Sequence, residues 1–229
     1  MLKAAPLSLF GLTGRVAVVT GAADGMGRSM ALGLAGAGAG IAVADVDEDR
    51  LEATVADIAA TGSRALGAHC DVGSEADVER LFETVDREFG QVDILVNNAG
   101  ANMVSAPAEV YPLDGWERMV RVNLTGQFLC ARAAGQRMIA QGRGGTIVNI
   151  SSISGWNAAN RQSLAFGAAK AGLNQLTKDL AVEWAHTESG STPSCPVSSG
   201  LEDGGDHRGS QERVACQDSA PRDPDGQDG

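Results

Sequence analysis

One short turn near the N-terminus constrains this chain more than any other feature. The mostly apolar run Arg15–Thr20 (RVAVVT) predicts a buried strand, and the glycine-rich segment Gly21–Gly27 (GAADGMG) follows it and opens a helix. Glycines in such a turn let the backbone approach a pyrophosphate, and the helix N-terminus supplies amides and a positive dipole. Glycines that serve only the turn and packing are the other interpretation. The candidate phosphate-binding residues are Gly21, Asp24, Gly25, Met26 and Gly27.

Short β-branched runs alternate with longer amphipathic stretches up to about residue 187. Strands are expected over Arg15–Thr20, Ile41–Ala44, Ala65–His69, Asp93–Val96 and Thr146–Ile150. Helices are expected over about Gly25–Gly38 and Glu48–Ala60, after the capping residue Ser74, and over about Leu113–Ala140 and Ser163–Ala185. Apolar strands separated by helices predict an α/β fold with a doubly wound parallel sheet, a three-layer architecture of the Rossmann type.

A carboxylate at the end of the second predicted strand supports a dinucleotide site. Asp45 lies 24 residues after Gly21, at the distance where an acidic side chain can accept the adenosine ribose hydroxyls. The other interpretation is that Asp45 caps the turn together with Asp47. A carboxylate repels a 2′-phosphate, and Asp24 stands where a basic residue would favour NADP, so the sequence predicts NAD as the preferred cofactor.

The composition changes sharply after Thr187. Of the 42 residues from 188 to 229, 18 are Gly, Pro or Ser and only three are Leu or Val, so little apolar surface is available to offset the entropy of ordering. We therefore expect a dinucleotide-binding domain over residues 1–187, incomplete at its C-terminal end, and a disordered tail over 188–229.

Charge and composition exclude several kinds of partner. The chain carries a formal charge of −11 without a basic cluster, which argues against nucleic acid and anionic membranes. No apolar run reaches the roughly 18 residues of a membrane span, and no signal-peptide cleavage pattern is seen. The four cysteines are scattered and the three histidines have no metal-ligand spacing. The expectation is a reduced cytoplasmic protein without a metal site.

Five motifs occur in the order typical of one enzyme family. They are Thr20–Gly27 (TGAADGMG), Asp71-Val72, Asn97–Gly100 (NNAG), Asn123 within RVNLTGQF, and Ser151-Ser152. Over about residues 10–187 the chain resembles the short-chain dehydrogenase/reductase family in its single-domain form. Taken singly, the asparagines could satisfy a turn and Ser152 could simply end a strand.

The resemblance assigns roles to the residues of these motifs. It implies that Asp71 and Val72 contact adenine, and that Asn98, Ala99 and Gly100 line the cofactor. It also implies that Ser152 orients the substrate carbonyl and that Asn123 helps to hold a relay water.

The catalytic motif departs from the family pattern. Members carry Tyr-x-x-x-Lys on one helix face, where the ammonium lowers the phenol pKa and the phenol exchanges a proton with the substrate. This chain has Phe166 and Lys170 at those positions, and its single tyrosine, Tyr111, lies in the distant turn VYPLDGW. By the resemblance Lys170 binds the nicotinamide ribose; a solvated helix lysine is the alternative. The loss of a general acid costs about 10²–10⁴ in rate.

The tail lacks the strand and Pro-Gly turn that follow this helix in the family. Codons for residues 187–200 can be chosen so that the shifted frame reads Gly-Val-Arg-Val-Asn-Ala-Val-Val-Pro-Gly-Phe-Val-Arg, which is the family segment. We therefore hypothesise a one-base insertion or deletion near the Thr187 codon, which the nucleotide sequence would test. The last two strands of the sheet are then expected to be missing, which would leave the fifth strand as an uncovered edge.

Two functions follow from these observations. The first is an NAD-dependent oxidoreductase that moves a hydride between NAD(H) and a small secondary alcohol or ketone. It is expected to be impaired in this chain by Phe166 and by the absence of the later helix that carries the substrate lid in the family. The alternative is a catalytically inactive NAD-binding protein or a frameshifted gene product. The resemblance further implies a homodimer or homotetramer built on the helices over Leu113–Ala140 and Ser163–Ala185.

Overall fold

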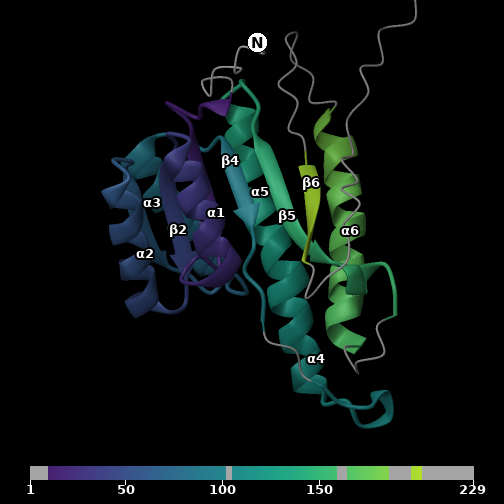
Figure 1. Cartoon of the computed structure of the whole chain (residues 1–229). Helices are drawn as coiled ribbons and strands as arrows, with labels where there is room; N and C mark the ends of the chain where they lie inside the picture. Colours follow the sequence, from purple (N-terminus) through teal and green to yellow (C-terminus); the bar gives the residue numbers. More distant parts are fainter. Residues whose placement is uncertain (1–9, 102–104, 159–163, 186–196, 203–229) are drawn as a thin grey trace, which may run out of the picture.

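The computed structural model describes residues 10–101, 105–158, 164–185 and 197–202, which form a parallel sheet between two layers of helices (Figure 1). The strands are β1 Val16–Thr20, β2 Gly40–Asp45, β3 Ala65–His69, β4 Ile94–Asn97, β5 Thr146–Ser152 and β6 Val197–Glu202. The α-helices are α1 Gly25–Gly36, α2 Glu48–Ala60, α3 Glu75–Phe89, α4 Leu113–Val120, α5 Gly126–Ala140 and α6 Leu164–Ala185. Three short helical turns are η2 Ala108–Val110, η3 Arg121–Thr125 and η4 Ile153–Gly155.

The order of the strands determines where a ligand can bind. The order is β3-β2-β1-β4-β5-β6, and every neighbouring pair is parallel. The chain therefore winds outward in one direction from β1 and in the other direction from β4, and a crevice forms where these two strands end. The predicted doubly wound parallel sheet is confirmed.

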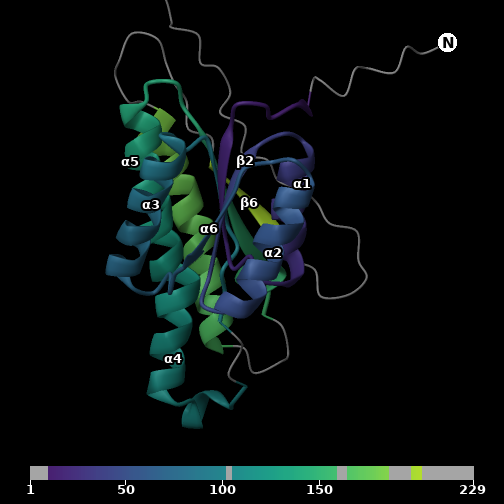
Figure 2. The same cartoon turned by 90° about the vertical axis from the view of Figure 1, so that its left-hand side faces the viewer.

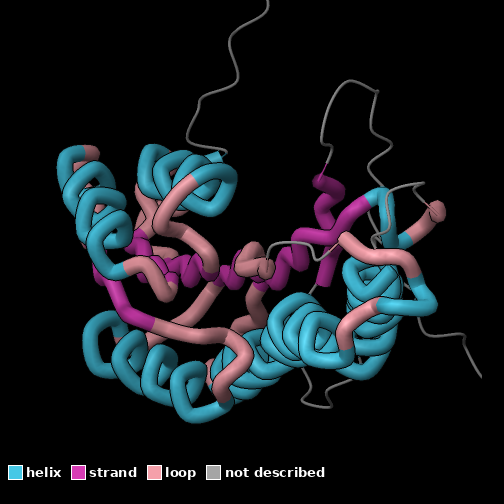
Figure 3. The backbone as a smooth tube through the Cα atoms, turned by 90° about the horizontal axis from the view of Figure 1, so that it is seen from below, coloured by secondary structure: helices cyan, strands magenta, loops and turns pink. Residues whose placement is uncertain are grey.

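Both faces of the sheet are covered, as predicted from its fully apolar strands. Helices α1 and α2 lie on one face and α3, α5 and α6 lie on the other, as Figures 2 and 3 show from two further directions. Strand β1 serves both layers, because Ala17 and Val19 belong to the core beneath α1 while Val16 and Val18 belong to the core beneath α3 and α5. All four side chains are buried.

The helix predicted over Leu113–Ala140 is interrupted in the structure. Between α4 and α5 the segment η3 forms one π-helical turn, in which the N–H of Gly126 bonds to the carbonyl of Arg121. A Cβ atom on Gly126 would lie 2.9 Å from Val72 Cγ2, so the helix passes very close to the loop after β3. Such a turn holds one residue more than an α-turn, which the apolar spacing of the sequence did not reveal.

A sixth strand corrects the expectation of an uncovered sheet edge. Residues Val197–Glu202 lie in the tail that composition predicted to be disordered, yet they form β6, which pairs in parallel along β5 from Ile147 to Ser152. Backbone pairing is the physical reason, since the outer N–H and C=O groups of β5 need partners whatever side chains the pairing strand carries. The other residues of the tail lie outside the described residues, as does any seventh strand.

Within the part of the chain described by the structure, none of the helices has the length and apolar character needed to cross a bilayer.

Candidate functional site

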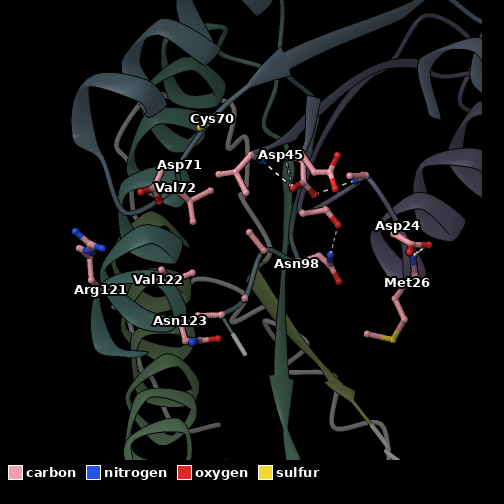
Figure 4. A pocket seen from close by; sticks show the side chains of 18 of the residues that line it. Asp24, Met26, Asp45, Cys70, Asp71, Val72, Asn98, Arg121, Val122 and Asn123 are labelled. Carbon is pink, nitrogen blue, oxygen red and sulfur yellow. Dashed lines mark hydrogen bonds between the residues drawn. The ribbon is translucent and has the colours of Figure 1, made fainter. Parts of the chain in front are cut away.

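A large cavity opens at the carboxyl ends of the central strands and has a volume of about 980 Å³. Its wall combines the glycine turn, the ends of β2, β3 and β4, the segment from α4 to η3, and the start of α6. In Figure 4, Asp24 and Met26 lie on the side of α1, Arg121 and Val122 lie opposite, and Asp45 and Asn98 lie between them. The lining residues are Gly21, Ala23, Asp24, Gly25, Met26, Asp45, Val46, Asp47, Arg50, Cys70, Asp71, Val72, Asn98, Ala99, Gly100, Ala101, Arg118, Arg121, Val122, Asn123, Phe166 and Lys170.

The glycine turn packs directly on the loop that follows β4. Gly21 has a φ of +64°, and a Cβ atom there would lie 2.7 Å from Ala99 Cα. A Cβ atom on Gly27 would overlap the carbonyl oxygen of Gly21. Asn98 joins the two loops, because its Nδ2 donates to the carbonyls of Thr20 at 3.1 Å and Gly21 at 2.9 Å. Gly27 therefore packs closely against the backbone of the turn and is not among the residues that line the cavity.

The N-terminus of α1 faces the cavity with a capping carboxylate. Asp24 accepts a hydrogen bond from the N–H of Gly25 at 2.7 Å, and a Cβ atom on Gly25 would have no other atom within 4 Å. Arg50 lies beside this cap, with its guanidinium 3.3 Å from Asp24 and 3.5 Å from Asp47. This end of the cavity therefore presents helix amides together with a net negative set of side chains.

Asp45 lines the cavity and caps a turn at the same time. Its carboxylate accepts from the backbone N–H groups of Ala23 at 3.0 Å, Val46 at 2.7 Å and Asp47 at 3.2 Å. The capping interpretation is thus confirmed as a structural role of this side chain. A carboxylate has about four acceptor positions, so one position is left for a ligand hydroxyl.

The loop after β3 supplies an apolar wall. Val72 and Cys70 are both buried, while Asp71 accepts from the N–H of Gly73 at 2.8 Å. Burial, reinforced by the nearby carboxylates of Asp77 and Asp71, raises the pKa of the Cys70 thiol to about 12. Cys70 is therefore a neutral part of the wall at physiological pH.

Lys170 is a buried residue, which excludes the solvated-lysine alternative. Only 2% of its surface is exposed, and its Nζ donates to the carbonyl oxygen of Ile150 at 2.6 Å. The same Nζ lies 5.6 Å from the centroid of the Phe166 ring, within the range of a cation–π contact. Both residues line the cavity, so the structure brings the two residues of the altered catalytic motif together.

Two other predicted catalytic residues are placed differently from each other. Asn123 lines the cavity and is fully buried; its Nδ2 donates to the carbonyl of Met119 at 3.2 Å, and its Oδ1 has no hydrogen-bond partner among the described residues. Ser152 ends β5 and is also buried, and its Oγ accepts from the N–H of Ser154 at 3.2 Å. Ser152 is not among the residues that line the cavity.

Sequence reasoning missed several lining residues, notably the cationic ones. Arg50, Arg118 and Arg121 all contribute to the wall. Arg118 and Arg121 shortly precede Asn123 in the sequence, and this proximity to a predicted site residue could have indicated that they line the site. Cys70, which directly precedes Asp71, could have been identified in the same way. Within the described ranges, no group of three or more His, Cys, Asp or Glu side chains is placed to hold a metal ion.

Comparisons with known proteins agree with this geometry. A family model described as short chain dehydrogenase matches residues 15–189. The chain is 41% identical over 187 residues to the D-threitol dehydrogenase of Mycolicibacterium smegmatis, an alignment that covers 80% of this chain and 71% of that protein.

Solved structures are similar over comparable lengths. A short-chain type dehydrogenase/reductase from Mycobacterium marinum has a TM-score of 0.79 at 37% identity and covers 84% of this chain and 74% of its own. An NAD⁺-bound xylitol dehydrogenase has a TM-score of 0.76 at 34% identity, and the alignment covers 82% of this chain and 69% of the xylitol dehydrogenase chain.

Proposed function

Because this chain belongs to the short-chain dehydrogenase/reductase family, we propose that it binds NAD(H) and is an oxidoreductase of secondary alcohols or ketones whose turnover is strongly reduced. The cavity at the carboxyl ends of β1 and β4 is the proposed site. One observation carries the proposed impairment: a phenyl ring, with no proton to transfer, faces the Lys170 ammonium in this cavity.

The residues present suit a dinucleotide. The open space beside Gly25 at the start of α1 suits a pyrophosphate, and the free acceptor position of Asp45 suits a ribose hydroxyl. Val72 and Asp71 would flank the adenine, and Lys170 would hold the second ribose. When bound, the nicotinamide supplies or accepts the hydride; the protein residues bind, orient and exclude water.

The charges around the first ribose position support NAD over NADP. Three carboxylates lie there, on Asp24, Asp45 and Asp47, and Arg50 already contacts two of them. A 2′-phosphate would meet net negative charge. The NAD⁺-bound state of the similar xylitol dehydrogenase is consistent with this preference.

Proton transfer is the step that this chain lacks. Lys170 donates a hydrogen bond from Nζ to the carbonyl oxygen of Ile150, and Ser152 has a hydroxyl that can donate to a substrate oxygen. Phe166 has no hydroxyl, so this side chain cannot give a proton to the reacting oxygen or take one from it. We infer that hydride transfer without this group is slower by about 10²–10⁴.

The second candidate function is an NAD-binding protein without turnover. The absence of a hydroxyl at Phe166 favours this function as well. Measured NADH binding would distinguish such a protein from a chain that has lost the cofactor site.

The experiment uses the full chain. NADH and NADPH binding is measured by calorimetry, and turnover is followed by NADH absorbance with a panel of secondary alcohols and ketones. Tight NADH binding with slow turnover supports the first proposal, and binding without turnover supports the second. Turnover at rates ordinary for an enzyme would show that Phe166 does not impair the site.

We also propose a homodimer or homotetramer. Phe128 and Ile139 on α5 and Val182 on α6 are large apolar residues that are exposed on the helices expected to form the contact. Light scattering coupled to size-exclusion chromatography tests this, with Val182→Asp as the variant expected to dissociate the assembly. A monomeric mass for the unaltered chain would contradict it.

A further inference from the structure

We propose that Asn174 is a positioning residue that, together with Ser151 and Gly155, locks α6 onto the end of β5 and thereby fixes the depth of the Lys170 ammonium. The inference rests on the proposed function, in which Lys170 holds the nicotinamide ribose. Asn174 does not line the cavity, so it acts through Lys170 and not on a ligand.

The first part of the lock is a buried hydrogen bond between β5 and α6. The hydroxyl of Ser151 donates to Asn174 Oδ1 at 2.5 Å and lies 3.5 Å from the carbonyl oxygen of Lys170. Ser151 has no exposed surface and Asn174 has 6%. A hydrogen bond removed from water in this way is costly to leave unmade, so it fixes the pair.

The second part is a close backbone contact. A Cβ atom on Gly155 would lie 2.8 Å from the carbonyl carbon of Lys170 and 2.9 Å from Asn174 Nδ2. Only a glycine allows η4 to approach α6 this closely. The Nδ2 atom of Asn174 is buried without a hydrogen-bond partner among the described residues. Asn174 is therefore held through its oxygen and packs its amide against the η4 backbone.

The spacing of these residues explains why the contacts act together. Phe166, Lys170 and Asn174 are four residues apart and share one face of α6. Lys170 binds the carbonyl of Ile150, and Asn174 binds the hydroxyl of Ser151, the next residue of β5. Two successive helical turns thus hold two successive strand residues. A single contact would allow α6 to rotate about its axis, whereas two contacts define both this rotation and the position of the helix along β5.

The chain offers a direct measurement of this lock that needs no cofactor. It contains three lysines, Lys3, Lys170 and Lys178, and Lys178 is exposed on the same helix. Reductive methylation of the full chain, followed by peptide mass spectrometry, reports the accessibility of each amine. Lys178 serves as the internal standard in every sample.

The test variant is Asn174→Ala and the matched control is Thr177→Val. Thr177 is equally buried on α6, but it bonds to Asn149 and Leu173, away from Lys170. We expect Asn174→Ala to raise the methylation rate of Lys170 at least about tenfold, because local opening governs access to a buried amine. The control should leave this rate within about twofold of the wild type. Equal rates in the two variants overturn the proposal.

A second readout separates positioning from burial. NADH affinity should fall about tenfold in Asn174→Ala and in Ser151→Ala, and the double variant should fall no further, because the two residues form one contact. Faster methylation with unchanged NADH affinity overturns the positioning role. If the wild-type chain binds no NADH, the proposed function fails, and the methylation rates still decide whether the lock exists.

Discussion

The ring of Phe166 covers the ammonium of Lys170, with 5.6 Å between the ring centroid and Nζ. The ammonium also donates to the carbonyl of Ile150 at 2.6 Å. These two contacts orient the amino group within the cavity, while the neighbouring phenyl ring has no proton to exchange. This pairing predicts a separation between cofactor binding, which needs Lys170, and turnover, which needs an acid at position 166.

The substitution Phe166→Tyr should increase turnover. The added hydroxyl would stand on a ring already packed beside Lys170, and a positioned general acid contributes about 10²–10⁴ in rate. Initial rates with the best alcohol or ketone of the panel measure the gain. Phe166→Leu is the control, since it keeps an apolar side chain without a hydroxyl. Equal rates for the tyrosine variant and the wild type would show that another defect limits the reaction.

Gly27→Ala should impair the cofactor site. The added methyl group would overlap the carbonyl of Gly21 and approach Asn98 Nδ2 to 2.6 Å, so the turn must shift. We expect the free energy of unfolding to fall by about 1–3 kcal/mol, together with a loss of NADH affinity. Urea denaturation and calorimetry measure the two effects.

Gly33→Ala is the control for this experiment. Gly33 lies on the same helix, and a Cβ atom there would contact nothing within 4 Å apart from its own chain neighbours and helix backbone. Alanine there should stabilise α1 by about 0.5–1 kcal/mol and leave NADH affinity unchanged. A Gly27→Ala variant that bound NADH as tightly as this control would rule out the close approach as a requirement.

Asp77 should make the stability of the fold depend on acid pH. The N–H of Asp71 and the hydroxyl of Ser74 donate to its carboxylate and hold the pKa of Asp77 below its ordinary value. Because the folded pKa is lowered, the stabilisation is present above the unfolded pKa of about 3.9 and is lost as the pH falls through the folded pKa. Asp77→Asn should be less stable than the wild type near neutral pH and should lose less stability in acid.

Urea midpoints measured from neutral to acid pH test this. Asp57→Asn is the control, since Asp57 is exposed on α2 and forms an ion pair with the half-buried Arg28. A slope in acid that is the same for Asp77→Asn and for the wild type would contradict the assignment.

Most of the fold could be predicted because the inner strands β1, β2, β4 and β5 are largely buried on both faces. The runs that form β1, β2 and β5 are apolar enough to be recognised without any contact being known. The π-turn at Asn123 and the strand β6 could not be predicted in this way. The first depends on how closely Gly126 packs on Val72, and the second on backbone pairing along β5.

The candidate site was predicted to a similar extent. The ordered motifs identified many of the lining residues, Asn98 among them. The spacing after Gly21 identified Asp45, and the altered catalytic motif identified Lys170. The burial of Lys170 and the contacts of Asp45 depend on atoms from distant segments, so a sequence pattern cannot supply them. Arg118 on α4 and Arg121 on η3 line the cavity, and neither is among the site residues predicted from the sequence.

Asp45→Asn separates the two roles of this side chain. The amide keeps an acceptor oxygen for the N–H of Ala23 but loses the charge, and a hydrogen bond to a charged group contributes about 1.5–3 kcal/mol. We expect NADH affinity to fall about tenfold or more, and the ratio of NADPH to NADH affinity to rise, because less negative charge would face a 2′-phosphate. Calorimetry with both cofactors measures these changes, and urea denaturation measures the loss of stability from the weakened turn. Asp57→Asn is the control, since Asp57 is an exposed carboxylate on α2 that is not among the cavity-lining residues. A variant at position 45 that loses stability while binding both cofactors like the wild type would show that Asp45 only caps the turn.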